Sequence, residues 1–167
     1  MDENNKKNRL EVIIEIPMGS RNKYEFDKES GHIKFDRMLF SAVHYPSDYG
    51  FIPSTLAEDG DPLDALVLVT EPTFPGCHID CYPIGLFKME DEKGIDHKIL
   101  CVPSGDPNWN NISGLENVPE HLLMEIENFF EIYKKLENKK TIVEGWREKS
   151  EALTVIQEAK SRFKNSK

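Results

Sequence analysis

The stretch that organises this chain is DGDPLD at residues 59–64, followed at once by the apolar run ALVLV at residues 65–69. The apolar run predicts a buried strand, so three carboxylates lie directly at the start of one strand. Gly60 can adopt a positive φ without steric cost, and Pro62 favours an extended conformation for Asp61. Carboxylates this close repel one another unless a cation joins them. Oxygen ligands in this number suit Mg²⁺, Mn²⁺ or Ca²⁺.

Other acidic motifs share parts of this pattern. An acidic surface turn is the simplest alternative, since Asp and Gly are common in turns. An EF-hand loop is excluded because, counted from Asp59, Leu63 takes the place of the third acid, Asp64 that of the glycine and Thr70 that of the final Glu. An aspartyl phosphatase would place its acids after a hydrophobic strand, and residues 54–58 do not form one. The rest of the chain must therefore decide between a turn and a metal site.

Length and composition predict one globular domain spanning residues 1–167. The chain has 38% hydrophobic and 31% charged residues, which is ordinary for a soluble globular protein. Its formal net charge of −9 argues against a general binder of nucleic acid or of acidic membranes, because phosphate backbones attract a basic surface. A small anionic substrate stays possible where metal ions or local bases invert the field.

The N-terminus and the cysteines bear on location. Residues 1–8 are polar and predict a flexible tail, with no apolar signal region after its lysines. No stretch approaches the apolar length of a membrane span, so we expect a cytoplasmic protein without a membrane partner. The three cysteines imply no disulfide framework, because their number is odd and their density low.

Hydrophobic periodicity predicts an α+β chain that is mostly β. Alternation indicates strands at residues 10–16, 23–27, 32–37, 65–69, 82–89, 99–102 and 141–143, with Ile33 and Phe35 facing inward. Residues 41–53 are expected to form an ordered, non-helical crossing segment. Helical spacing indicates two C-terminal helices. One begins near Pro119 and carries its apolar stripe as far as Leu136, and the other begins at Ser150 as N-cap.

A zinc site is the alternative reading of CHIDC at residues 77–81. The spacing matches no usual zinc pattern and no second cysteine pair exists, although His97 and Cys101 lie downstream. Free cysteines are more often small buried hydrophobes, so we assign no metal role to Cys77, Cys81 or Cys101.

Acidic and basic residues together suggest phosphoryl chemistry. Asp91 and Asp96 flank a glycine turn as a second acidic group, and Lys23, Arg37, Lys98 and Lys134 supply cations on strands and turns. Sites for phosphoryl transfer typically combine divalent ions with Lys, Arg and Tyr hydrogen-bond donors. The chain has no P-loop, no GxGxxG and no GxSxG motif. A metal-activated water is therefore the expected nucleophile.

The chain resembles the soluble family I inorganic pyrophosphatases, in the short form typical of bacteria, from about residue 12 to residue 146. The hexapeptide at residues 59–64 is similar to that family's signature. Other segments agree in order and spacing: EIP at 15–17, KYE at 23–25, DR at 36–37, YP at 45–46, YG at 49–50, residues 91–98 and YK at 133–134.

The resemblance implies an OB-like closed β-barrel flanked by the two main C-terminal helices, and Mg²⁺-dependent hydrolysis of inorganic pyrophosphate to two orthophosphates. It implies several Mg²⁺ ions per site, with Mn²⁺ or Zn²⁺ as possible substitutes, and a homo-oligomer, with a hexamer favoured. The implied roles are metal ligands at Asp59, Asp64, Asp96 and Asp91; the catalytic base at Asp61; substrate contacts at Lys23, Arg37, Tyr49, Lys98, Tyr133 and Lys134; and outer-shell carboxylates at Glu15 and Glu25.

Two other classes of function stay open at this point. An OB-like barrel could bind nucleic acid or another anion without catalysis, but acids stand where a basic groove would be needed. A structural divalent-cation protein would use the acids for stability alone. The bases Lys23, Arg37 and Lys98 argue against that reading, because a cation site has no use for anion-binding groups.

Overall fold

The computed structural model describes residue 3 and residues 7–167; of the predicted tail, residues 1–2 and 4–6 lie outside the described residues. The strands are β1 Leu10–Ile16, β2 Asn22–Asp27, β3 His32–Met38, β4 Asp48–Phe51, β5 Asp64–Val67, β6 His78–Asp91, β7 Gly94–Ile95, β8 Lys98–Pro103 and β9 Ile142–Glu148. The helices are α2 Glu120–Ile132 and α3 Lys149–Asn165, with short 3₁₀ turns η1 Leu115–Asn117 and η2 Lys135–Glu137.

Five strands close into a ring in the order β1, β4, β5, β8, β6. The ring closes because β1 pairs with β4 along one edge and with β6 along the other. Strands β5 and β8 are parallel, whereas the other neighbours in the ring are antiparallel. Full closure leaves no exposed edge within the ring. The OB-like closed barrel expected from the resemblance is confirmed.

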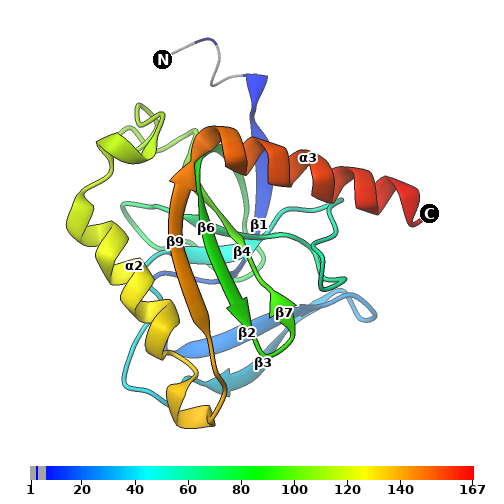
Figure 1. The fold of residues 1–167 in the computed structure, drawn as a ribbon, viewed down its shortest axis with the longest axis vertical. Coiled ribbons are helices and arrows are strands. Elements are labelled where there is room, and N and C mark those ends of the chain that lie inside the picture. Colours follow the sequence, from blue (N-terminus) through cyan, green and yellow to red (C-terminus); the bar gives the residue numbers. More distant parts are fainter. Residues whose placement is uncertain (1–2, 4–6) are drawn as a thin grey trace.

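The remaining elements surround this barrel (Figure 1). Strands β7 and β9 both pair with β6 and extend the sheet beyond the ring. Strands β2 and β3 form a separate two-stranded ribbon. Figure 1 shows α3 crossing one end of the barrel, α2 beside β9, and the β2–β3 ribbon at the end opposite α3. No helix within the described residues is long and apolar enough to cross a membrane.

The predicted period-2 pattern of β1 is confirmed, since Leu10, Val12, Ile14 and Ile16 are all buried. These side chains join two core clusters that fill the barrel and the space beneath the helices. Strand β1 also approaches β4 very closely. A Cβ atom at Gly50 would lie 1.9 Å from the carbonyl oxygen of Ile13, so only glycine lets the two strands close this side of the ring.

Several predicted boundaries are wrong, and tertiary pairing explains them. Strand β4 arises inside the segment expected only to be ordered and non-helical, because β1 and β5 pair with it on both sides. Strands β6 and β9 are longer than expected, since β6 pairs in turn with β1, β8 and β9. Strand β9 runs directly into α3, so Glu148 is the N-cap and Ser150 lies inside the helix.

Two side chains predicted to face inward are exposed instead. Phe35 on β3 is 61% exposed, because the β2–β3 ribbon is a sheet separate from the main one, and the ring that Phe35 contacts is Tyr24 of the same ribbon. Leu136 is 63% exposed, because α2 ends at Ile132 and η2 breaks the helical periodicity that would have buried it.

Candidate active site

One cavity of about 890 Å³ gathers nearly all of the predicted site residues. They come from β1, the β2–β3 ribbon, β4, the acidic turn, the β6–β7 hairpin and the end of α2, which lie far apart in the sequence. Lys98 is buried beneath this cavity rather than lining it, and contacts three of its residues. The predicted residues in the lining are Glu15, Lys23, Glu25, Arg37, Tyr49, Asp59, Asp61, Asp64, Asp91, Asp96, Tyr133 and Lys134.

The acidic turn is shaped by its own backbone. Gly60 adopts φ +87°, as the sequence predicted, and this left-handed conformation is one that glycine adopts readily. The backbone N–H of Asp61 donates to Asp59 Oδ1 at 3.0 Å, and the N–H of Ala57 donates to the Asp61 carbonyl at 2.7 Å. The Asp61 side chain is exposed and lines the cavity. The turn therefore holds the backbone of Asp61 and leaves its carboxylate facing the cavity.

The C-terminal helix holds the base of this turn. The N–H of Leu56 donates to the Ala159 carbonyl at 3.0 Å, and Arg162 Nη1 donates to the Leu56 carbonyl at 2.9 Å. Leu63, at the other side of the turn, donates its N–H to Thr55 Oγ1 at 2.9 Å. Helix α3 thus fixes the segment that presents the aspartates.

Replacing Arg162 with Ala should destabilise the fold by about 1 kcal/mol, because one partly exposed hydrogen bond to a carbonyl is lost. It should also raise the Mg²⁺ concentration needed for half-maximal activity by about twofold, the size of effect expected of a few tenths of a kcal/mol. Thermal melts and a Mg²⁺ titration would measure both. A melting temperature and Mg²⁺ requirement equal to those of the wild type would contradict this role for α3.

A buried lysine joins two of the aspartates. Lys98 is fully buried, and its Nζ donates to Asp64 Oδ2 at 3.1 Å and to Asp96 Oδ2 at 3.0 Å. It also donates to the Tyr49 hydroxyl at 2.8 Å, and that hydroxyl donates to Asp64 Oδ2 at 2.8 Å. The Nζ lies 5.2 Å from the centroid of the Phe130 ring, a favourable cation–π distance. The buried Lys98 Nζ and the Tyr49 hydroxyl both have hydrogen-bond partners, as burial requires.

Burial and neighbouring charges shift the pKa values of the aspartates. Burial raises the pKa of Asp64, with Lys98 opposing the change and Asp96 adding to it. Burial acts the same way on Asp96, but the charge of Lys98, hydrogen bonds with Asp64 and Lys98, and the charge of Lys134 together outweigh burial and lower the pKa. Burial also raises the pKa of Asp59, and the negative charges of its acidic neighbours in the cavity add to it. The carboxylates are close enough to affect one another, as the sequence suggested.

The basic side chains are held by acids around the rim. Lys23 Nζ lies 3.0 Å from Glu25 Oε1 and 3.2 Å from Asp36 Oδ2. Arg37 contacts the same Asp36 oxygen, which therefore bridges the two cations. At the end of α2, Lys134 Nζ lies 3.3 Å from Asp91 Oδ2. A phosphate oxygen could take the place of these carboxylates, since it offers the same negative acceptor.

Two further predicted residues, Glu15 and Tyr133, are largely buried. Glu15 Oε2 accepts a hydrogen bond from the Phe26 N–H at 2.9 Å, and burial raises the pKa of its carboxyl group. Tyr133 is buried against the rings of Phe129 and Phe130 while lining the cavity, and burial raises the pKa of its hydroxyl. Its proton is therefore retained for donation.

Comparison with known proteins agrees with this arrangement. The family model described as inorganic pyrophosphatase matches residues 12–164. The chain belongs to the inorganic pyrophosphatase family. The resemblance to family I is confirmed, and the family's relatives include archaeal as well as bacterial proteins.

Relatives within the family cover almost the whole chain. An inorganic pyrophosphatase from Methanosarcina mazei is 63% identical over 156 residues, 93% of this chain and 92% of the relative. The crystal structure of inorganic pyrophosphatase from Thermus thermophilus matches with a TM-score of 0.92 and 46% identity, over 98% of this chain and 95% of that one. A truncated Trypanosoma cruzi pyrophosphatase in complex with PPi matches with a TM-score of 0.84 and 25% identity, over 95% of this chain and 70% of that one.

The carboxylate oxygens that line the cavity are suitable ligands for Mg²⁺. Eleven acidic side chains line the cavity against seven basic ones, so a highly charged anion would be repelled unless cations entered with it. Carboxylate oxygens are the ligands that Mg²⁺ prefers. Within residues 7–167 no three Asp, Glu, His or Cys side chains are yet close enough to hold an ion, because Lys98 lies against Asp64 and Asp96 and like charges spread the rest. Bound cations would draw the carboxylates together.

The sequence did not single out Glu92, which lines the cavity, or Glu137, which lies beside it and contacts a lining residue. Glu92 lines the cavity with both carboxylate oxygens 3.3 Å from Lys134 Nζ, and Glu137 pairs with Arg37. Glu92 lies in the acidic group that the sequence singled out around Asp91, which was the available signal. Glu137 gave no signal, because its partner is 100 residues away.

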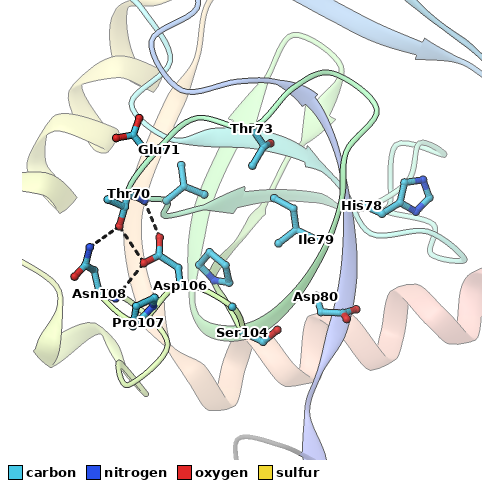
Figure 2. A pocket seen from close by; sticks show the side chains of 13 residues that line it. Thr70, Glu71, Thr73, His78, Ile79, Asp80, Ser104, Asp106, Pro107 and Asn108 are labelled. Atoms are coloured by element: carbon cyan, nitrogen blue, oxygen red, sulfur yellow. Dashed lines mark hydrogen bonds between the residues drawn. The ribbon is translucent and has the colours of Figure 1, made fainter.

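A second cavity, of about 560 Å³, shares no lining residue with the first (Figure 2). Figure 2 shows a hydrogen-bonded group in which Thr70 donates to Asp106 through its N–H and hydroxyl at 2.8 and 3.0 Å, and Asn108 donates to Thr70 Oγ1 at 2.8 Å. Since none of the predicted site residues lines this cavity, we assign it no part in catalysis. Of the free cysteines, Cys81 and Cys101 are buried in the core, as small hydrophobes would be.

Proposed function

We propose that this chain hydrolyses inorganic pyrophosphate to two orthophosphates in the carboxylate cavity, with Mg²⁺ as cofactor. Membership of the family makes it an inorganic diphosphatase, a hydrolase of a phosphoanhydride bond. The observation that supports the assignment of the site is the convergence of the aspartates with Lys23, Arg37 and Lys134 in one cavity. Acids recruit cations and bases contact phosphate oxygens, and pyrophosphate hydrolysis needs both.

The chain's own residues have distinct tasks in this proposal. Asp59, Asp64, Asp91 and Asp96 would hold the cations, which when bound neutralise the phosphates and acidify the attacking water. Asp61 accepts the proton of that water as its oxygen bonds to one phosphorus and the bridging P–O bond breaks.

Basic and hydroxyl groups receive the two phosphates. Lys23 and Arg37 on the β2–β3 ribbon, with Lys134 and Tyr133 at the end of α2, supply N–H and O–H donors to one cavity. Charge-assisted hydrogen bonds of this kind bind both phosphates and stabilise the negative charge that develops on the leaving one. Lys98 and Tyr49 set the positions of Asp64 and Asp96 from below. Glu15 and Glu25 are proposed to hold water around the cations.

Replacing Asp64 with Ala tests the metal-binding role. We expect the Mg²⁺ concentration for half-maximal activity to rise about tenfold, which corresponds to losing about 1.4 kcal/mol of ion binding. Stabilisation of the fold by Mg²⁺ should weaken in parallel. Asp80→Ala is the matched control, because Asp80 is exposed, pairs with Arg9 and lies outside the cavity. An unchanged Mg²⁺ dependence in Asp64→Ala would remove this residue from the site.

The finer expectations of the sequence stay predictions. These are the homohexamer, Mn²⁺ or Zn²⁺ as substitutes for Mg²⁺, the cytoplasmic location, and the absence of nucleic-acid and membrane partners. Analytical ultracentrifugation would test the first, and activity with each metal the second. The net charge of −9 supports the expectation that nucleic acid is not a partner.

A further inference from the structure

Glu137 is a largely buried acid whose charge is matched by a residue of the cavity. Its side chain is 5% exposed, less than the 21% of its partner Arg37. Glu137 Oε1 lies 2.8 Å from Arg37 Nε, and Arg37 Nη2 donates to Glu137 Oε2 at 3.2 Å. Arg37 Nη2 therefore makes the hydrogen bond to this carboxylate, whereas Nε lies close to it as an ion pair without a hydrogen bond. The contact fixes direction through Nη2 and matches charge along the whole edge.

The backbone after α2 places this carboxylate. The turn η2 follows Lys134 directly, and the Glu137 N–H donates to the Lys134 carbonyl at 3.0 Å. Asn138 then adopts φ +57°, a left-handed conformation that ends the turn. Leu136 points outward while Glu137 points inward. One short turn thus connects Glu137 to Tyr133 and Lys134, which are the phosphate contacts proposed at the end of α2.

The two acids around Arg37 use different parts of the guanidinium. Glu137 lies along the Nε–Nη2 edge, whereas Asp36 accepts from Nη1. Asp36 also contacts Lys23, so its carboxylate lies between Lys23 and Arg37, where an anionic ligand would bind. Glu137 contacts neither Lys23 nor any other cation among the described residues. Glu137 can therefore keep its hold on Arg37 when a phosphate displaces Asp36.

We propose that Glu137 is a positioning residue for Arg37. It directs into the cavity the N–H groups of the guanidinium that Glu137 does not itself bind, and it keeps their position constant relative to Tyr133 and Lys134. The inference rests on the proposed role of Arg37 as a phosphate contact. An arginine side chain has about 2 kcal/mol of rotamer entropy to lose on binding. The hydrogen bond to Glu137 orders the Arg37 side chain before substrate binds, so that this entropy is not lost on binding.

A double-mutant cycle in kcat/KM for pyrophosphate tests the proposal. Glu137→Ala should lower kcat/KM about tenfold, mainly through a higher KM, because the contact that it orients exists in the bound substrate as well as in the transition state. Glu137→Gln, which keeps an acceptor of the same size, should lose only about threefold. In an Arg37→Ala background, either change should have no further effect, because Glu137 acts only through Arg37.

Glu131→Ala is the matched control, since Glu131 is an exposed acid near the end of α2, the helix that precedes η2, and its kinetics should equal those of the wild type. If Glu137 were merely structural, its effect would persist undiminished in the Arg37→Ala background, and that result would overturn the proposal. Wild-type KM in Glu137→Gln would overturn it too, and this variant serves if Glu137→Ala fails to fold. Wild-type kinetics in Arg37→Ala would instead remove Arg37 from the site and the inference with it.

Discussion

Replacing Asp61 with Asn should lower the turnover of pyrophosphate by about a hundredfold, the lower end of what a positioned general base contributes. Asparagine has the shape of aspartate but cannot accept a proton at neutral pH. The exposed Asp61 side chain accepts no hydrogen bond from the rest of the described chain, and the turn is held through its backbone. The substitution should therefore leave the fold intact, which circular dichroism and a thermal melt would show beside the initial rates at saturating Mg²⁺.

Glu58→Gln is the matched control for this variant. Glu58 lies in the same loop, is exposed, pairs with Arg162 at 3.9 Å and does not line the cavity, so its replacement removes the same formal charge without removing a carboxylate of the cavity. Its turnover should stay near that of the wild type. Turnover of Asp61→Asn within twofold of the control would refute the role of Asp61 as base.

Replacing Lys98 with Met should have the largest effect on stability. Methionine fills a similar volume, but Asp64 and Asp96 lose the one cation that both contact. Removing one partner of a buried ion pair costs about 3–5 kcal/mol, so in chelator the melting temperature should fall steeply. Mg²⁺ should restore more stability to this variant than to the wild type, because a bound cation replaces the missing charge. The loss should also shrink as the pH is lowered, since an unpaired buried carboxylate protonates more readily.

Lys88→Met is the control for Lys98. Lys88 lies on the neighbouring strand β6, is partly exposed and pairs with Glu144 at 3.9 Å. A surface pair of this kind contributes about 1 kcal/mol or less, and the control should respond to Mg²⁺ like the wild type. Thermal melts of the three proteins with Mg²⁺ and with chelator would decide. An equal Mg²⁺ shift in Lys98→Met and wild type would contradict the link between Lys98 and the ion sites.

Local chemistry made much of the fold and site predictable. The alternation of β1 gave its bounds and its buried face, and the order of Gly and Pro in the acidic turn explained how it presents three carboxylates. The resemblance then named the residues that the structure gathers in one cavity. Sequence spacing does not predict their individual roles, because a carboxylate that binds a cation and one that accepts a proton look alike in a sequence.

What the sequence did not predict depends on contacts between distant segments. Strand β4 exists because β1 and β5 pair with it, although its own residues include a glycine and follow a proline. The exposure of Phe35 depends on the β2–β3 ribbon standing apart from the main sheet. Glu137 is brought to Arg37 by the fold alone, since 100 residues separate them. Such long-range pairings leave no local pattern to read.

The most direct test of the account is phosphate release from pyrophosphate, with Mg²⁺ and with chelator, beside ATP and p-nitrophenyl phosphate as alternative substrates. The account predicts fast release from pyrophosphate alone, abolished by chelator and by Asp61→Asn. Comparable release from all three substrates would contradict the substrate assignment. No release from any of them, by a folded protein that still binds Mg²⁺, would contradict the catalytic assignment and favour an anion-binding barrel.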